Sequence, residues 1–446
     1  MTDERPARSI CEILRQHGFT ALFAGGCVRD RLLGRLPRDY DVATNAEPEQ
    51  VRAMFPRNVP VGEAFGVVKV LQDDQEIDVV TFRSDGTYRD GRHPDSVAYA
   101  EPREDAARRD FTINALFSDP VTGEVLDFTG GLEDLNRRII RCVGNPRQRF
   151  LEDRLRLLRA IRFAAGLGFN IDPDTWDALK NVTAEQGLQG VSAERIRDEL
   201  DRMLTEGGAR SALERLAESG LLAVILPEVA ALRGVPQPEN FHPEGDVWEH
   251  TMRMLALLPP DPPVELAWAV LLHDAGKPRT ISFADRIRFH HHEKVGQSMV
   301  PLVGRRLRFP NRRTERITWL VGNHMRLAAV PDMREGRRRR FASEPDFPLL
   351  VKLARLDSLA SHGDLAVIEW IRRYLDSLSA SQPVPQPLIT GKDLKQLGIS
   401  PGPVYRDLLQ TLHDRQMEGA FTTREEGLKL ARQLAAGCQP PDQHSD

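Results

Sequence analysis

The stretch Ala24-Gly25-Gly26-Cys27-Val28-Arg29-Asp30 decides how the first part of this chain folds. Apolar residues 21–23 lead into the glycine pair as a strand does, and residues 28–33 have the spacing of a short helix. Glycines at a strand-to-helix turn let backbone N–H groups approach a phosphate closely, and the start of the helix adds partial positive charge. The stretch therefore predicts a strand, a tight turn and a helix that together can hold a phosphate group.

Two carboxylates, Asp39 and Asp41, stand directly downstream, where we predict a strand over residues 39–43. Because the two residues are two positions apart, their side chains point to one face of that strand. Two carboxylates on one face suit Mg²⁺ that bridges a triphosphate and an attacking hydroxyl. With the glycine turn they indicate a nucleotidyl-transfer site. Asp78, on the outward face of a strand predicted over 76–82, is a third candidate.

Length and composition indicate a soluble protein of several domains, because 446 residues exceed one ordinary core. The net charge of −4 does not indicate a nucleic-acid binder, so any such contact must come from local basic patches. The four cysteines lack metal-ligand spacing, the charged N-terminus lacks the apolar core of a signal peptide, and no apolar run has the length of a membrane span. These features predict a reduced, cytoplasmic setting and no membrane partner.

Strand and helix signals divide the chain into four predicted parts. They alternate in the first part, only helical spacing follows in the second, most histidines lie in the third, and proline-rich breaks separate the later parts. The parts are an α+β head over residues 1–145, an all-α neck over 146–234, a helical histidine-rich module over 235–375, and a helical C-terminal segment over 376–446 with a frayed tail from Gln439. The first helix predicted in the neck runs over residues 150–166.

Further motifs follow the glycine turn and the Asp-x-Asp strand in a fixed order. They are DGRHPDSV at Asp90–Val97, RRDFTINA at Arg108–Ala115, the acidic glycine turn at Asp127–Leu135, EDRLRLLRAIRF at Glu152–Phe163 and SAERIRDEL at Ser192–Leu200. Any one of these would be a weak signal, but the ordered series is specific. The series resembles the family of class II tRNA nucleotidyltransferases and bacterial poly(A) polymerases, which are polymerase-β-like transferases, and it covers residues up to about 230.

The resemblance implies a polymerase-β-like head and a role for each matching residue. By resemblance, Gly26 and Arg29 hold the nucleotide phosphates, Arg109 contacts the nucleotide, and Asp39 and Asp41 bind Mg²⁺. The base-reading groups implied in the same way are Asp153, Arg156, Arg159 and Arg162. Residues three apart on one helix lie near one another, so these four are expected to form a slanting polar stripe. The implied reaction is attack of an RNA 3′-hydroxyl on the α-phosphate of CTP or ATP, which releases pyrophosphate.

A second constellation lies in the histidine-rich module, where His273 and Asp274 end the apolar run Leu266–Leu272. Ionisable groups that abut so apolar a run are costly unless they are paired or bound to a metal. The candidate ligands are His250, His273, Asp274, His292, His324 and Asp357. Imidazole and carboxylate groups converging from different helices suit one or two divalent transition metals. His242, His290 and His291 are interpreted as structural, surface or supporting groups.

The order H…HD…H…H…D in this module is similar to the HD superfamily of metal-dependent phosphohydrolases. That resemblance implies removal of phosphates, or opening of cyclic phosphates, at RNA ends, with Lys277 contacting phosphate. The alternative is an HD fold kept for packing, for RNA binding or for dimerisation. The densest basic cluster, Arg337, Arg338, Arg339 and Arg340, is a candidate RNA-binding surface, and its alternative is a solvated helix face.

Three functions remain open at this point. The first is a tRNA nucleotidyltransferase that adds CCA, or only the terminal A; the second is a poly(A) polymerase of the same family. The third, from another class, is an HD phosphohydrolase with a non-catalytic RNA-binding head. Intact Asp39, Asp41, Asp153 and Arg156 argue against the third. The expected polar stripe favours tRNA repair, although discrimination depends on loop differences near residues 84–100.

Overall fold

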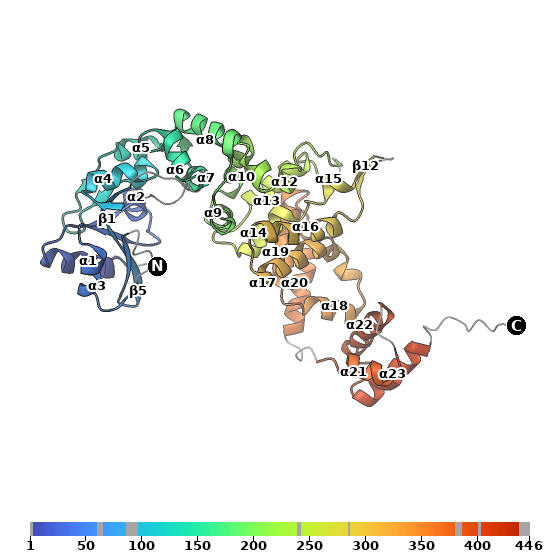
Figure 1. The fold of residues 1–446 in the computed structure, drawn as a ribbon. Helices are drawn as coiled ribbons and strands as arrows, with labels where there is room; N and C mark the ends of the chain where they lie inside the picture. Colours follow the sequence, from blue (N-terminus) through green and yellow to red (C-terminus); the bar gives the residue numbers. More distant parts are fainter. Residues whose placement is uncertain are drawn as a thin grey trace. The chain divides into compact units, whose positions relative to one another are not determined.

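The computed structural model describes residues 3–59, 66–85, 97–238, 242–283, 286–379, 386–399 and 403–436. Apart from Val97, the predicted motif at residues 90–97 lies outside these ranges, as do the tail from Gln439 and most of the loop over 84–100. The chain forms two compact units. The first comprises residues 1–230, 259–264 and 303–309, and the second comprises the remaining residues (Figure 1).

A mixed seven-stranded sheet organises the first unit. Its order is β3-β4-β5-β2-β1-β8-β9, in which β2 and β5 pair in parallel and the other neighbours pair antiparallel. These strands are β1 (Ala21–Ala24), β2 (Asp41–Thr44), β3 (Asn58–Val59), β4 (Val67–Gln72), β5 (Gln75–Thr81), β8 (Phe117–Ser118) and β9 (Val125–Leu126). Beside them, β6 (Arg83–Asp85) pairs with β7 (Val97–Tyr99), and β10 (Ile139–Ile140) pairs with β11 (Asn170–Ile171).

The two faces of this sheet bury different side chains, as the alternation along a strand requires. On β1, Phe23 packs into a cluster with Ile10 and Leu14 of α1 (Glu4–Gln16). Leu22, one position earlier, packs on the other face with Phe82 and Phe117. The α+β head expected from the sequence is confirmed, and α1 and α3 (Pro48–Met54) lie on the face that carries Phe23 (Figure 1).

The strand predicted over residues 39–43 begins later than expected. The ladder starts where Asp41 pairs with Ala24, and β1 ends at Ala24 because Gly25 turns the chain with φ +72°. Asp39 therefore has no partner on β1 and lies in the connection that leads into β2. The two aspartates are close in sequence, but only Asp41 belongs to the strand.

Helices make up the rest of the first unit. They are α2 (Gly26–Leu32), α4 (Pro102–Arg108), α5 (Gly131–Arg137), α6 (Pro146–Glu152), α7 (Leu155–Leu167), α8 (Pro173–Gln186), α9 (Ala193–Thr205), α10 (Ala209–Glu218), α11 (Leu221–Ile225) and α12 (Pro227–Ala230), with the short 3-10 turn η2 (Thr112–Asn114). The single helix predicted over 150–166 is wrong, because α6 ends at Glu152 and α7 begins at Leu155. Asp153 is extended between them, and its carboxylate accepts the Leu155 N–H at 3.0 Å. Aspartate competes with the helix in this way because its side chain bonds nearby backbone N–H groups.

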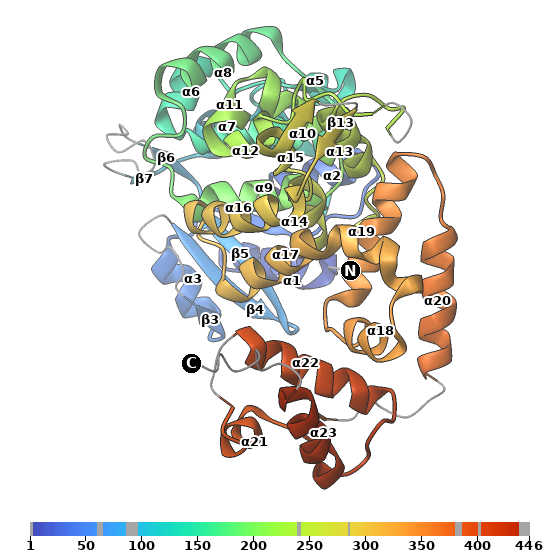
Figure 2. The ribbon, with the colours of Figure 1, turned by 90° about the vertical axis from the view of Figure 1, so that its right-hand side faces the viewer.

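The second unit is almost entirely helical. Its elements are α13 (Val247–Ala256), α14 (Val264–Leu272), α15 (Lys277–Thr280), the hairpin β12 (Ile281–Phe283) and β13 (Ile287–Phe289), α16 (His292–Arg306), α17 (Asn311–Asn323), η3 (His324–Asp332), α18 (Glu335–Ala342), α19 (Phe347–Ala360) and α20 (Ala366–Ser379). At the C-terminal end, α21 (Gly391–Gln396), α22 (Pro403–Met417) and α23 (Arg424–Ala436) enclose their own core around Leu394, Leu412 and Phe421. Figure 2 shows these three helices gathered together. Within the described ranges, no helix has both the length and the apolar character needed to cross a membrane.

Candidate active site and metal centre

A cavity of about 600 Å³ in the first unit lies between the glycine turn, β2 and α7. It brings together nine of the ten residues that the sequence predicts for nucleotide transfer. These are Gly26, Arg29, Asp39, Asp41, Arg109, Asp153, Arg156, Arg159 and Arg162. Asp78 is the exception, because it stands on β5 beside Asp41 but does not line the cavity.

Two carboxylates, Asp39 and Asp41, concentrate negative charge at one edge of this cavity, and Asp78 lies beside Asp41 on the neighbouring strand. Burial, and then the neighbouring charges of Asp39 and Asp78, raise the pKa of Asp41 to about 7. Asp78 is partly neutralised by Lys69, whose ammonium lies 3.0 Å from its carboxylate. Carboxylate oxygens held together in this way suit a hard divalent cation such as Mg²⁺, whose charge removes their mutual repulsion. The donor set therefore fits the metal that the sequence implied.

The glycine turn leaves open space beside these carboxylates. Gly25 has φ +72°, and a Cβ atom built on it would lie 3.0 Å from Nη1 of Arg109. A Cβ on Gly26 would meet no atom closer than Nη2 of Arg29 at 3.9 Å. Gly25 is therefore required by backbone conformation and space, whereas Gly26 keeps its backbone accessible from the cavity.

Asn114 and Asp105 hold the two arginines that face the glycine turn. Arg29 donates from Nη1 to Oδ1 of Asn114 at 2.7 Å and pairs with Asp30 at 2.7 Å. Arg109 donates to the backbone oxygen of Asn114 at 3.1 Å and pairs with buried Asp105 at 2.9 Å. Sequence reasoning gave neither Asn114 nor Asp105 a role. The spacing of Asp105 four residues before Arg109 on a helix is the signal that could have found it.

The arginines of α7 are each fixed by a carboxylate. Arg159 donates to Asp110 at 2.7 Å, Arg162 donates to Glu199 at 2.6 Å, and Arg156 donates to Glu152 at 2.9 Å. Burial favours the neutral form of Asp110, but the charge and hydrogen bonds of Arg159 outweigh it and lower the pKa of Asp110 to about 2. The guanidinium of Arg162 also lies over the ring of Phe163, 4.1 Å from its centroid. These three arginines form the polar face of α7.

Asp153 is not part of that helical stripe. It lies in the extended link before α7, and Arg195 of α9 pairs with its carboxylate at 2.7 Å. The expectation that all four groups share one helix is therefore wrong for Asp153. The cavity still holds Asp153 together with the three arginines, because the link and α7 line the same space.

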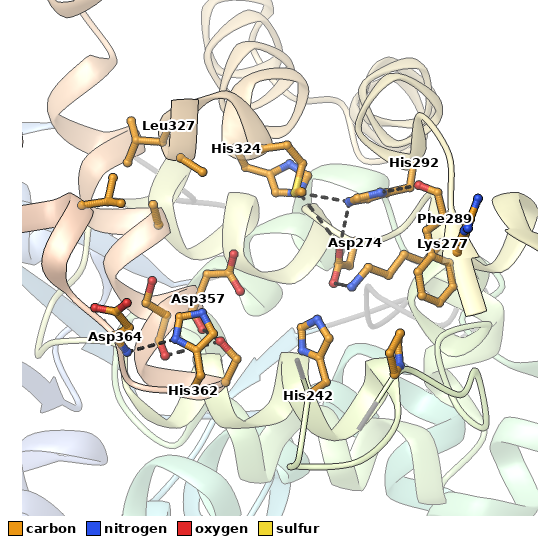
Figure 3. Close-up of a pocket in the computed structure, with 18 of the residues that line it drawn as sticks. His242, Asp274, Lys277, Phe289, His292, His324, Leu327, Asp357, His362 and Asp364 are labelled. Atoms are coloured by element: carbon orange, nitrogen blue, oxygen red, sulfur yellow. Dashed lines mark hydrogen bonds and ion pairs between the residues drawn. The ribbon is translucent and has the colours of Figure 1, made fainter. Parts of the chain in front are cut away.

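A second cavity, of about 780 Å³, lies in the second unit and is shown in Figure 3. The six ligands predicted there form two adjacent groups, in each of which the ligand atoms lie within 4.8 Å of one another. One group is Asp274, His292 and His324, and the other is His250, His273 and Asp357. Lys277 also faces this centre, with its ammonium 2.7 Å from Asp274.

Backbone carbonyls set the tautomers of three of these histidines. Nδ1 of His273, His292 and His324 bonds the carbonyl oxygens of Val270, Phe289 and Val321 at 2.8, 3.0 and 2.7 Å. Because a carbonyl oxygen can only accept, each Nδ1 carries a hydrogen, and each Nε2 presents a lone pair to the centre.

The inward nitrogens lie close to one another and to the carboxylates of Asp274 and Asp357. Nε2 of His292 and Nε2 of His324 are 3.2 Å apart, an approach that requires a proton or a cation between two lone pairs. Burial, and then the neighbouring His273, lower the pKa of His324 to about 4, so its ring is neutral at pH 7. Among the described residues, buried Nε2 atoms of His250 and His273 have no hydrogen-bond partner. The donor set therefore fits divalent metal ions.

His242 and Glu244 belong to the same centre, which the sequence did not reveal. His242 was expected to be a structural residue near a linker, but its ring lines the cavity (Figure 3). Its Nδ1 bonds Glu244 at 2.8 Å, and Glu244 also bonds Nδ1 of His250 at 2.7 Å. Glu244 carried no signal in the sequence, because a lone carboxylate before a helix is common.

The basic cluster within α18 is largely engaged with the protein. Arg338 donates to the carbonyl oxygens of Val330, Pro331 and Met333, and Arg340 pairs with Asp414 at 2.6 Å. Arg339 donates to the carbonyl of Met417, whereas the Arg337 side chain is exposed. RNA binding by these four arginines stays a prediction.

Comparisons with known domains agree with this architecture. Residues 21–141 match the poly A polymerase head domain, residues 168–232 match the domain described as "Probable RNA and SrmB- binding site of polymerase A", and residues 247–361 match the HD domain. The fold and its sites thus define a nucleotidyltransferase head, a helical segment that matches this second domain, and an HD domain in one chain. The two resemblances expected from the sequence motifs are confirmed.

Two curated relatives that the chain resembles are CCA-adding enzymes. The enzyme of Geobacillus stearothermophilus is 45% identical over 220 residues, which are 49% of this chain and 54% of that enzyme. The enzyme of Enterococcus faecalis is 45% identical over 201 residues, or 45% of this chain and 49% of that enzyme. The chain thus spans about half the length of the curated relatives it matches.

Solved structures extend the likeness along the whole chain. The Bacillus stearothermophilus CCA-adding enzyme in complex with CTP has a TM-score of 0.68 and 28% identity, covering 98% of this chain and 100% of that one. The Thermotoga maritima CCA-adding enzyme complexed with tRNA has a TM-score of 0.55 and 20% identity, covering 97% of this chain and 95% of that one. This second likeness shows a shared fold.

Proposed function

We propose that the chain is a tRNA nucleotidyltransferase that adds CCA, or the terminal A, to tRNA 3′ ends from CTP and ATP. The observation that carries the proposal is the cavity of the first unit. It joins a carboxylate pair, an accessible glycine turn and a set of fixed arginines in one space. The likeness to CCA-adding enzymes at 45% identity supports the choice of substrate.

Each side chain has a separate task in this reaction. Asp39 and Asp41 hold Mg²⁺, which when bound lowers the pKa of the RNA 3′-hydroxyl and stabilises charge on the reacting phosphate. Arg29 and Arg109 bind the triphosphate, and Asn114 holds both guanidinium groups at the glycine turn. Because these groups are already hydrogen-bonded to the protein, little reorganisation is needed when a nucleotide enters.

The base is selected by groups on and beside α7. Asp153 offers hydrogen-bond acceptors, and Arg156, Arg159 and Arg162 offer donors from fixed positions in the same cavity. A carboxylate can accept from the donor edge of cytosine or adenine, and a guanidinium beside it can donate to the acceptor edge. In this way the protein itself takes the place of a template.

The HD domain supports a second proposed activity, hydrolysis of phosphate esters at RNA ends with divalent transition metals. The supporting observation is that the inward-facing histidine Nε2 atoms lie with the carboxylates of Asp274 and Asp357 in two adjacent groups of ligands. We assign one ion to Asp274, His292 and His324, and one to His250, His273 and Asp357. Lys277 lies beside Asp274 and is placed to bind a phosphate oxygen.

One experiment tests the transferase proposal. The protein is given tRNA that ends at the discriminator base, at C or at CC, with CTP and ATP separately and together, and the added sequence is read. We expect completion of CCA followed by a stop, or a single A on the CC end alone. Long A tails would identify a poly(A) polymerase instead, and no addition to any end would overturn the proposal.

A further inference from the structure

We propose that Glu244 is a positioning residue of the HD metal centre, which fixes the ring of His250 so that His250 Nε2 faces the metal. This inference rests on the proposed binding of two metal ions by the HD domain. Glu244 precedes α13, six positions before the ligand that it orients.

The contact between these two residues is short and wholly buried. Oε1 of Glu244 lies 2.7 Å from Nδ1 of His250, and neither side chain is exposed to solvent. A carboxylate can only accept a hydrogen bond, so Nδ1 of His250 carries a hydrogen and Nε2 is the nitrogen that is left to face a metal. His250 Nε2 lies 3.1 Å from the carboxylate of Asp357, but the two atoms are not aligned as a hydrogen bond. This arrangement is the one expected of two ligands that share one metal ion.

His250 differs from the other three histidines of the centre in what holds it. Neutral backbone carbonyls hold His273, His292 and His324. A charged acceptor makes the imidazole a stronger metal ligand than a neutral one does. Because His250 belongs to only one of the two ligand groups, Glu244 acts on the ion bound by His250, His273 and Asp357.

His242 is a second histidine that contacts the carboxylate of Glu244. Its Nδ1 lies 2.8 Å from the same oxygen of Glu244, and its ring packs edge-on against His250 with centroids 4.9 Å apart. His242, Glu244 and His250 are close enough to ligate a metal themselves. Both Nδ1 atoms, however, are engaged by one carboxylate oxygen, so these three residues form a hydrogen-bonded support for His250.

The test counts metal ions bound by the full chain. Chelator-stripped protein is titrated with Co²⁺, with excess Mg²⁺ present to occupy the carboxylate site of the head. We expect two bound Co²⁺ in the wild type. Glu244→Ala should keep one and bind the other roughly 10–100-fold more weakly. The affinity of Glu244→Gln for the second Co²⁺ should lie between those of the wild type and Glu244→Ala. The reason is that an amide oxygen still accepts the Nδ1 hydrogen but carries no charge.

A matched control removes a carboxylate that neighbours another ligand without holding it. Glu293 lies 4.0 Å from Nδ1 of His292, which bonds Phe289 instead, so Glu293→Ala should bind both ions as the wild type does. Unchanged binding by Glu244→Ala, or equal weakening of both ions with loss of apo-protein stability, would overturn the inference. If the wild type binds no Co²⁺, the proposed metal centre of the HD domain is contradicted, and the role of Glu244 is contradicted with it.

Discussion

Asp41 on β2 and Asp78 on β5 are direct partners in the parallel pair at the centre of the head sheet. The charge of Asp78 therefore acts on Asp41, after burial and Asp39, in raising the pKa of Asp41 to about 7. Asp78 itself is partly exposed and pairs with Lys69 at 3.0 Å. It does not line the cavity of the first unit. We therefore expect the two carboxylates to have different roles, although they stand on neighbouring strands: Asp41 lines the cavity, and Asp78 acts on Asp41 through its charge.

Asp78→Asn should therefore reduce nucleotide incorporation by less than about tenfold, which is less than 1.4 kcal/mol in the barrier. The physical reason is that Asp78 influences Asp41 through its charge and stays outside the cavity. The measurement is the initial rate of labelled AMP addition to tRNA ending in CC at saturating Mg²⁺. A loss as large as that of an Asp41 variant would show that Asp78 binds the metal directly.

The two glycines of the turn should respond differently to alanine. Gly25→Ala places a Cβ at a positive φ and against Arg109, so we expect a loss of roughly 1–2 kcal/mol in unfolding free energy. Gly26→Ala has room for its methyl group and should leave the thermal midpoint unchanged.

The same pair tests whether phosphates approach the turn. If the backbone of Gly26 contacts the triphosphate, Gly26→Ala should weaken ATP and CTP binding at least about tenfold while the fold stays intact. Equilibrium binding of both nucleotides, compared with the thermal midpoint, separates the two effects. Unaltered nucleotide affinity in Gly26→Ala would remove Gly26 from the phosphate site.

The pair of Asp110 and Arg159 should make the first unit sensitive to acid. The folded-state pKa of Asp110 is lowered from 3.8 to about 2. The contribution of its ionised carboxylate to the unfolding free energy is therefore present above pH 4 and is lost as the pH falls toward 2. The shift corresponds to roughly 2 kcal/mol. Asp110→Asn should lower the unfolding free energy by about that amount at pH 7, and the difference should narrow by pH 3. Urea unfolding followed by circular dichroism measures the unfolding free energy of both proteins at each pH. If the variant and the wild type differ equally at pH 7 and pH 3, the stabilising pair of Asp110 and Arg159 is contradicted.

Arg337 and Arg338 are neighbours with different expected roles in RNA binding. Arg337→Gln removes an exposed charge, and it should weaken RNA binding and reduce the slope of log affinity against log salt by about one phosphate contact. Arg338→Gln removes donors to three carbonyl oxygens and should lower the thermal midpoint instead. Salt titrations of tRNA affinity distinguish the two variants. An unchanged salt slope in Arg337→Gln would place the RNA elsewhere.

The sequence predicted the parts of the fold that depend on local pattern. The strand before Gly25, the helix after it and the apolar helix before His273 all follow from spacing and composition. The break at Asp153 was missed because the apolar repeat continues across it, while one side-chain hydrogen bond ends the helix. Pattern alone cannot weigh that bond against helical continuity.

Tertiary partners were the other part that pattern could not supply. Glu199 reaches Arg162 from 37 positions away, and Arg195 reaches Asp153 from 42. Such pairs depend on how α7 and α9 pack, which is decided by buried side chains far apart in sequence. The sequence therefore predicted the arginines of the cavity, but it did not predict the carboxylates that fix the orientation of their side chains.

The central claim is that the carboxylate edge of the head cavity transfers nucleotides to an RNA 3′ end. Asp41→Asn removes one of its two proposed metal ligands with little change in size, and Asp74→Asn makes the same change at an exposed position of the β4–β5 turn. The measurement is labelled AMP incorporation into tRNA ending in CC at saturating Mg²⁺. We predict a loss of at least about 100-fold for Asp41→Asn and a wild-type rate for Asp74→Asn. Incorporation by Asp41→Asn within about threefold of the wild type would contradict the account.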